Sequence, residues 1–176
     1  LAIVGESGSG KSVFTKTFMG MLDKNGKVTK GEILYNGMDL AKFSSEKDWL
    51  KIRGKEVAMV FQDPMTSLNP LKTVGKQIQE ALELHQNLHG RAARERTIEI
   101  LSDVGITEPE RRYKQYPHEF SGGMRQRAVI ATAIACNPNI LICDEPTTAL
   151  DVTIQAQIIE LLEQLQKKYR LTIIYI

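Results

Sequence analysis

The chain has 176 residues, a formal net charge of +2, and 25% charged against 42% hydrophobic residues. This length is sufficient for one domain with a hydrophobic core, and the composition is typical of soluble globular proteins. The small net charge does not favour a nucleic-acid partner, and the longest apolar stretch, near residues 128–136, is too short to span a membrane.

The hydrophobic pattern predicts elements along the whole chain. In chain order we expect a strand at 1–4, a helix at 12–22, a strand at 31–37, a strand at 56–61, a loop at 63–70, helices at 71–87, 91–104 and 121–136, a strand at 140–143, a helix at 152–169 and a strand at 171–176. The Asn36-Gly37 pair predicts a hairpin turn near residues 31–40.

Strands that alternate with helices predict an α/β fold with a parallel sheet covered on both faces. The helical block interrupts this alternation. We therefore expect one domain over residues 1–176, with a core formed by residues 1–62 and 137–176 and an inserted helical subdomain at residues 63–136. The chain begins and ends inside apolar runs, so we expect the domain to be truncated at both ends.

Residues 5–12 match the pattern G-x-x-x-x-G-K-[ST] without a mismatch, between an apolar run and a predicted helix. Glycines allow backbone N–H groups to converge on a phosphate, and the following helix contributes its positive N-terminal end. Lys11 would reach the β- and γ-phosphates of a nucleotide, and Ser12 would bind Mg²⁺. The predicted nucleotide-binding residues of this loop are Gly5, Glu6, Ser7, Gly8, Ser9, Gly10, Lys11 and Ser12.

A second candidate site follows the apolar strand at residues 140–143, which ends in Asp144 and Glu145. In a fold with a phosphate-binding loop, this strand delivers Asp144 to the metal ion. Glu145 would accept a proton from an attacking water. We therefore predict Glu145 and Lys11 as catalytic residues and Asp144 as a ligand of Mg²⁺.

A third candidate site is the Ser121-Gly122-Gly123 sequence at the start of a predicted helix, which offers a hydroxyl and two amides to an anion. Arg125 and Arg127 follow in the first turn, where cations are normally unfavourable. Their position fits a bound polyanion nearby, although solvated or acid-paired arginines would also explain it.

With these three elements the chain resembles the nucleotide-binding domain of ATP-binding cassette (ABC) transporters. This resemblance implies a P-loop NTPase (RecA-like) core, a partial antiparallel β subdomain, and binding of ATP and Mg²⁺. Residues 120–124 resemble the family signature Leu-Ser-Gly-Gly-Gln, with Phe120 and Met124 in place of the usual Leu and Gln.

The resemblance assigns further roles. Gln62 matches the glutamine that contacts Mg²⁺ and senses the membrane subunit, and Asp151 matches the aspartate that crosses the dimer interface. It also implies a head-to-tail dimer with a second ATPase subunit, in which Ser121 and Gly123 complete the partner's ATP site. The switch histidine and the adenine-stacking aromatic residue of the family have no counterpart within the chain.

The stretches at 61–70, 116–127 and 151–157 are similar to the first ATPase subunit of oligopeptide, dipeptide and nickel permeases. This similarity implies ATP-driven peptide import at the cytoplasmic face of the cell membrane, with transmembrane permease subunits as partners and a solute-binding protein as an indirect partner. The alternatives are an importer of nickel or another small solute, a non-transport ABC ATPase of DNA repair, chromosome structure or translation, and a degenerate subunit that binds ATP without hydrolysis.

Overall fold

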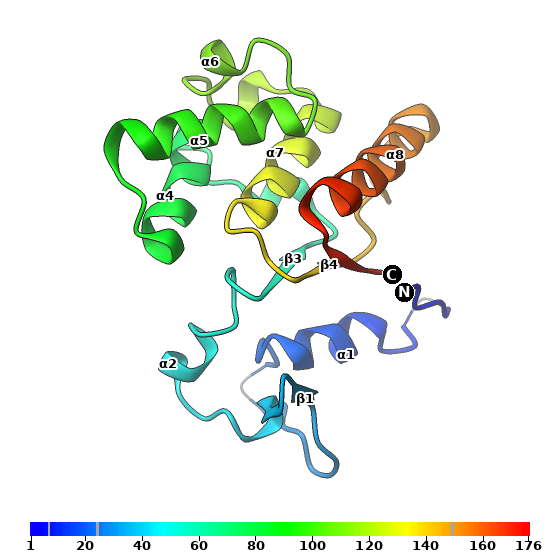
Figure 1. The fold of residues 1–176 in the computed structure, drawn as a ribbon. Helices are drawn as coiled ribbons and strands as arrows, with labels where there is room; N and C mark the ends of the chain where they lie inside the picture. Colours follow the sequence, from blue (N-terminus) through cyan, green and yellow to red (C-terminus); the bar gives the residue numbers. More distant parts are fainter. Residues whose placement is uncertain (7, 24, 149) are drawn as a thin grey trace.

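The computed structural model describes residues 1–6, 8–23, 25–148 and 150–176. Its centre is a parallel sheet with the strand order β3 (Val57–Val60), β4 (Ile140–Cys143) and β5 (Thr172–Tyr175). Helices α7 (Gly122–Ile134) and α8 (Val152–Tyr169) lie on one side of this sheet, and α1 (Lys11–Phe18) lies on the other (Figure 1). This arrangement confirms the expected α/β fold.

The strand expected at residues 1–4 is reduced to a single bridge. Ala2 pairs in parallel with Tyr175, and the Ile3 amide donates to the Tyr175 carbonyl at 2.8 Å. The segment therefore lies along β5, but it forms too few successive pairs for a ladder. Figure 1 accordingly places the two termini side by side.

The predicted hairpin is confirmed. Strand β1 (Leu34–Tyr35) pairs antiparallel with β2 (Met38–Asp39), and the turn residues Asn36 and Gly37 have φ values of 46° and 78°. Two successive positive φ values give the turn the twist that a two-residue hairpin requires.

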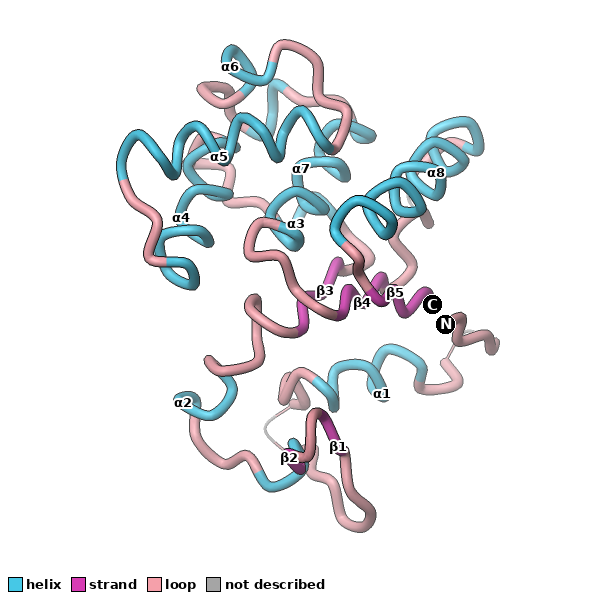
Figure 2. Tube along the Cα trace, viewed as in Figure 1, coloured by secondary structure: helices cyan, strands magenta, loops and turns pink. Residues whose placement is uncertain are grey.

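The part of the chain between β3 and β4 is mainly helical. In chain order it contains α3 (Pro64–Ser67), α4 (Val74–Gln86), α5 (Gly90–Asp103), α6 (Pro109–Arg112) and α7. They lie together on one side of the sheet (Figure 2). The expectation of a continuous loop at residues 63–70 is wrong, because this segment contains α3. The Thr66 and Ser67 hydroxyls donate to the Asp63 carbonyl at 3.2 and 2.8 Å, which stabilises this short turn of helix.

Several short elements were not predicted. They are α2 (Glu46–Trp49), α6, and the 3-10 helices η1 (Leu40–Lys42) and η2 (Pro117–Glu119). For α2 the sequence contained a signal, since the Ser45 hydroxyl caps the helix by accepting from the Asp48 amide at 3.3 Å. Elements of three or four residues are too short to show a hydrophobic period.

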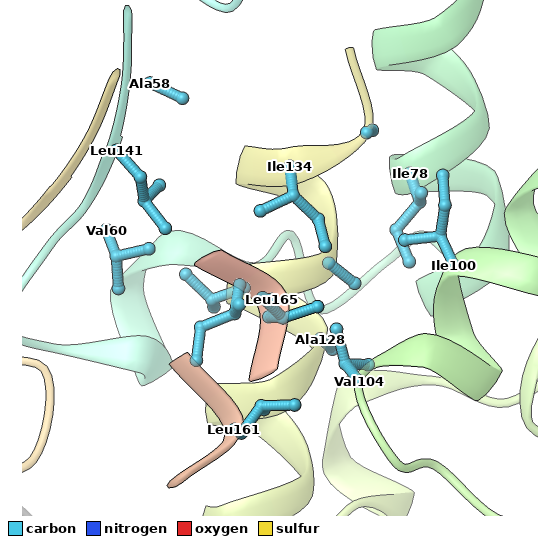
Figure 3. Close-up of a cluster of buried hydrophobic side chains, with 14 of the residues drawn as sticks. Ala58, Val60, Ile78, Ile100, Val104, Ala128, Ile134, Leu141, Leu161 and Leu165 are labelled. Carbon is cyan, nitrogen blue, oxygen red and sulfur yellow. The ribbon is translucent and has the colours of Figure 1, made fainter. Parts of the chain in front are cut away.

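One buried cluster joins the sheet to the helical block (Figure 3). Val60 and Leu141 of the sheet, Ile134 of α7, Leu165 of α8 and Ile100 of α5 are each at most 1% exposed. Because these side chains exclude water together, the hydrophobic effect stabilises the packing of both parts.

The longest helix in the described part of the chain, α8, carries its charged residues from its middle onward, at Glu160, Glu163, Lys167 and Lys168. Across the described residues, we find no helix with the length and apolar character needed to span a membrane.

Candidate active site

The phosphate-binding loop connects the segment beside β5 to α1. Gly10 is the N-cap of α1 with φ 89°, and Gly8 has φ 80°. Residues with a side chain rarely adopt these values, so the two glycines are required by the turn. Ser7, a predicted member of the loop, lies outside the described residues.

Lys11 lies in the first turn of α1 and folds back over the loop. Its Nζ donates to the carbonyls of Gly5 and Glu6, at 2.8 Å each. The ammonium group therefore sits at the mouth of the loop, held by backbone oxygen atoms that a phosphate group could replace.

The structure brings Ser12 and Asp144 together from opposite ends of the sequence. Asp144 follows β4 directly, the residue is 5% exposed, and its amide donates to the Val60 carbonyl at 2.9 Å. The Ser12 hydroxyl donates to Asp144 Oδ1 at 3.1 Å. A hydroxyl oxygen and a carboxylate thus meet next to the phosphate-binding loop, and both are hard ligands of the kind Mg²⁺ prefers.

Glu145 and Gln62 form a second pair beside the first. Gln62 Nε2 donates to Glu145 Oε2 at 2.9 Å, and the Thr148 hydroxyl donates to the same oxygen at 3.2 Å. Glu145 also has φ 46°, a conformation that is uncommon for a residue with a side chain and that is concentrated at functional sites. Sequence reasoning missed Thr148; the only signal was a hydroxyl three residues after the acid.

Residues of the loop and of both pairs line one cavity of about 280 Å³. Its lining residues are Gly8, Gly10, Lys11, Ser12, Val13, Gln62 and Glu145. Six of the residues predicted for nucleotide binding or catalysis therefore face the same space, which we call the phosphate-loop cavity.

The Ser-Gly-Gly sequence lies at a separate cavity of about 540 Å³, which we call the signature cavity. Ser121 is the N-cap of α7, and its hydroxyl accepts from the Met124 amide at 3.3 Å. A Cβ atom on Gly123 would lie 3.0 Å from Ile154 Cγ2, so α7 and α8 approach closely here. The lining residues are Ser121, Gly122, Gly123, Thr148, Leu150, Asp151 and Ile154.

The hypothesis that Arg125 and Arg127 face a bound polyanion is not supported by their orientation. Arg125 Nε donates to the Pro117 carbonyl at 2.9 Å, and Arg127 Nη1 donates to the Val104 carbonyl at 2.7 Å. Both guanidinium groups therefore bind backbone carbonyl groups of the helical block. Side chains in a helix point back toward its N-terminus, which brings these two over the preceding segments.

Cys143 is the last residue of β4 and precedes Asp144. Complete burial raises the pKa of its thiol to about 12. The strand that carries Asp144 is thus enclosed by apolar surroundings up to the residue before the carboxylate.

Comparison with known proteins assigns this arrangement to a family. A family model described as "ABC transporter" matches residues 1–148. The chain belongs to the ABC transporter family.

Relatives within this family agree along the whole chain. An oligopeptide transport ATP-binding protein, AmiE, of Streptococcus pneumoniae is 59% identical over 176 residues, which are 100% of this chain and 50% of the relative. A dipeptide transport ATP-binding protein, DppD, of Bacillus subtilis is 56% identical over 99% of this chain and 52% of the relative. The chain therefore spans about half the length of these relatives.

A solved ABC structure has the same fold. It is the dimeric structure of a post-hydrolysis state of the ATP-binding cassette MJ0796 bound to ADP and Pi, with a TM-score of 0.83 and 31% identity. The match covers 99% of this chain and 72% of the MJ0796 chain. The resemblance to the ABC family inferred from the motifs is confirmed.

Proposed function

We propose that this chain is the catalytic part of an ABC transporter subunit that binds and hydrolyses ATP to drive peptide import. The observation that carries the proposal is the convergence of Lys11, Ser12, Gln62 and Glu145 on one cavity beside the buried Asp144. The printed functions of the two bacterial relatives, oligopeptide and dipeptide transport, support the peptide cargo.

In the proposed reaction, water attacks the γ-phosphorus atom of ATP, and the bond to the β-phosphate oxygen breaks to give ADP and phosphate. Glu145 takes the proton from the attacking water, and the Gln62 amide and Thr148 hydroxyl orient its carboxylate. Lys11 exchanges its contacts with the loop carbonyls for phosphate oxygens and offsets their charge.

The oxygen atoms near the phosphate loop fit a magnesium ion. Ser12 and Asp144 would hold it, with Gln62 as a further ligand. When bound, Mg²⁺ neutralises charge on the β- and γ-phosphates. The described residues contain no cluster of three or more His, Cys, Asp or Glu side chains that could hold a metal ion.

We propose that the active unit is a head-to-tail dimer with a second ATPase subunit. The signature cavity presents the Ser121 hydroxyl and the backbone of Gly122 and Gly123, and no lysine is among the described residues that line it. Such a surface suits a phosphate held mainly by Lys11 of another subunit. The solved structure of MJ0796 is itself a dimer, which supports this arrangement.

Residues 63–136 are proposed to form an inserted subdomain of one nucleotide-binding domain that docks onto transmembrane permease subunits at the cytoplasmic face of the membrane. A cavity of about 190 Å³ lined by Phe61, Ser67, Leu68 and Gln77 among others lies at the start of this region. A cysteine at the exposed Ser67 (Ser67→Cys) should crosslink to a permease subunit, whereas Glu163→Cys on α8 should not. Equal crosslinking from both positions would contradict this docking surface.

The proposal is tested by the Glu145→Gln substitution in the full-length protein, assembled with its partner subunits and Mg²⁺. Removing the base should lower kcat for ATP by about 100-fold to 10,000-fold, while ATP binding persists. Steady-state phosphate release and equilibrium nucleotide binding are measured in parallel. Unchanged hydrolysis by Glu145→Gln would refute the assigned role, and binding without hydrolysis in the wild type would identify a degenerate subunit.

A further inference from the structure

The segment between β4 and α8 belongs to both cavities. Its first part, Glu145, lines the phosphate-loop cavity, whereas Thr148, Leu150 and Asp151 line the signature cavity. If each cavity holds part of a different ATP, this segment connects two nucleotide sites. A residue outside the cavities that holds this segment can therefore influence both sites.

Gln155, in the first turn of α8, makes contacts that suit this task. Its Nε2 donates to the Thr147 carbonyl at 3.0 Å and to the Leu150 carbonyl at 2.9 Å. Both N–H bonds of the amide are thus used, one on each side of the bend in the segment. The Leu150 amide also donates to the Thr147 carbonyl at 3.0 Å, so three hydrogen bonds meet within this turn.

The turn that Gln155 holds is linked directly to the proposed catalytic base. Thr148 follows Thr147, and its hydroxyl donates to Glu145 Oε2 at 3.2 Å. The Thr148 amide donates to the Glu145 carbonyl at 3.3 Å. A shift of the Thr147 carbonyl would therefore move the hydroxyl that orients the Glu145 carboxylate.

The backbone of Glu145 makes this support necessary. Its positive φ of 46° is unfavourable for a residue with a side chain, and such a conformation persists only where the surrounding contacts determine it. The Glu145 amide donates to the Ile176 carbonyl at 3.2 Å, so the residue after β5 supports one end of the segment. Gln155, from α8, supports the other end of the segment.

We propose that Gln155 is a positioning residue for ATP hydrolysis, which sets the orientation of Glu145 through the Thr147–Thr148 turn. This inference rests on the proposed function. Gln155 is half-buried and is not among the residues described as lining either cavity, so it acts through the segment and not through contact with a nucleotide.

The decisive experiment compares a variant that lacks the N–H donors of Gln155 with a variant that restores N–H donors at this position. Gln155→Leu keeps the approximate size of the side chain but has no N–H group, whereas Gln155→Arg again presents donors toward the two carbonyls. The exposed Gln157, two residues further along α8, provides the matched control as Gln157→Leu. All variants are made in the full-length protein with its partner subunits.

We expect Gln155→Leu to lower kcat about 10-fold to 100-fold, with ATP affinity and KM changed less than about twofold, because misplaced catalytic groups affect the reaction more than binding. Gln155→Arg should recover most of the lost kcat, and Gln157→Leu should match the wild type. Wild-type kcat in Gln155→Leu, or a loss that Gln155→Arg does not reduce at all, would overturn the inference.

If Gln155→Leu does not fold, Gln155→Glu replaces it, since an ionised carboxylate of the same size accepts but does not donate. The same loss of kcat at unchanged ATP affinity is expected, and normal kcat would again overturn the inference. Glu145→Gln is measured in the same assay. Absence of hydrolysis in the wild type refutes the proposed function, and unchanged hydrolysis by Glu145→Gln refutes the role of Glu145. A strongly reduced kcat in Glu145→Gln beside a normal kcat in Gln155→Leu refutes only the role of Gln155.

Discussion

Each of the two cavities is lined by a serine, two glycines and one acidic residue, but among the described lining residues only those of the phosphate-loop cavity include a lysine and a glutamine. In the phosphate-loop cavity, Gln62 and Glu145 face each other, Lys11 is held by loop carbonyls, and Ser12 is bonded to Asp144. In the signature cavity, the groups are a capping serine, two glycines, residues of the segment before α8, and Ile154 of α8. The first surface combines a lysine with a carboxylate that an amide and a hydroxyl orient, which suits it to the proposed chemistry. The second presents a serine and two glycines at a helix N-terminus, which suits it to the proposed recognition of a phosphate.

The largest expected difference concerns Lys11, which lines the phosphate-loop cavity and has no lysine counterpart among the described residues of the signature cavity. Lys11→Ala should lower the ATP affinity of the isolated subunit about 100-fold, because a charged hydrogen bond to phosphate contributes about 2–3 kcal/mol. Titration with a fluorescent ATP analogue measures this loss. The matched control is Lys16→Ala, in the last turn of the same helix and exposed to solvent. If Lys11→Ala and Lys16→Ala bind ATP equally well, Lys11 has no special role in nucleotide binding, and the proposed difference between the two cavities is contradicted.

A smaller effect is expected at the signature cavity, and only in the assembled dimer. Gly123→Ala would place a Cβ atom 3.0 Å from Ile154 Cγ2, so α7 and α8 would have to separate slightly. We expect hydrolysis by the dimer to fall about tenfold, with nucleotide binding by the single subunit unchanged. Ile154→Ala removes the contacted methyl groups and should restore part of the activity. A loss of binding in the single subunit would indicate that the two cavities are not independent.

Ser121 provides a further test of the signature cavity, because this residue lines the cavity and also stabilises the fold. Its hydroxyl caps α7, so Ser121→Ala should lower the free energy of unfolding by about 1 kcal/mol. Ser121→Asp keeps a capping oxygen, but it adds a negative charge to the proposed phosphate site. Urea unfolding should find Ser121→Asp near wild type, while dimer hydrolysis should be lower than in Ser121→Ala. The reverse order of hydrolysis would argue against a phosphate at this position.

The smallest effect concerns the strand that delivers Asp144. Burial raises the pKa of the Cys143 thiol to about 12, so the reactive thiolate is scarce in the folded protein between pH 7 and 9. In the unfolded chain the thiol pKa returns to about 8.5 and the thiolate forms readily in this range. Alkylation of Cys143 by iodoacetamide at pH 8.5 should therefore be slow under native conditions and rapid in urea. Rapid native alkylation would mean that the end of β4 is accessible.

Local patterns predicted several elements well. The helix expected at residues 152–169 has the same bounds in the structure, and the strand expected at residues 140–143 is β4. The Asn36-Gly37 hairpin is also present. These elements have a strong period, an apolar run or a specific turn pair, which act between near neighbours in the chain.

Other features depended on distant contacts. The segment at residues 1–4 was expected as a strand because it is apolar, but the structure pairs it with β5 at one position only. The expected loop at residues 63–70 contains α3, which packs against α7. Neither outcome can be derived from a short window of sequence, because each depends on which distant segment lies alongside.

The amino-acid sequence by itself determined the family, the phosphate-binding loop, the two acids after β4 and the Ser-Gly-Gly cap, because each is a contiguous pattern whose chemistry follows from backbone geometry and residue type. Only the tertiary structure decided that Ser12 meets Asp144 and that Gln62 meets Glu145. It also decided that Arg125 and Arg127 turn toward backbone carbonyls and that Gln155 supports the segment after Glu145. The two contact pairs join residues that the packing of the sheet and helices around one core brings together. The contacts of the arginines and of Gln155 depend on the direction in which each side chain leaves its helix.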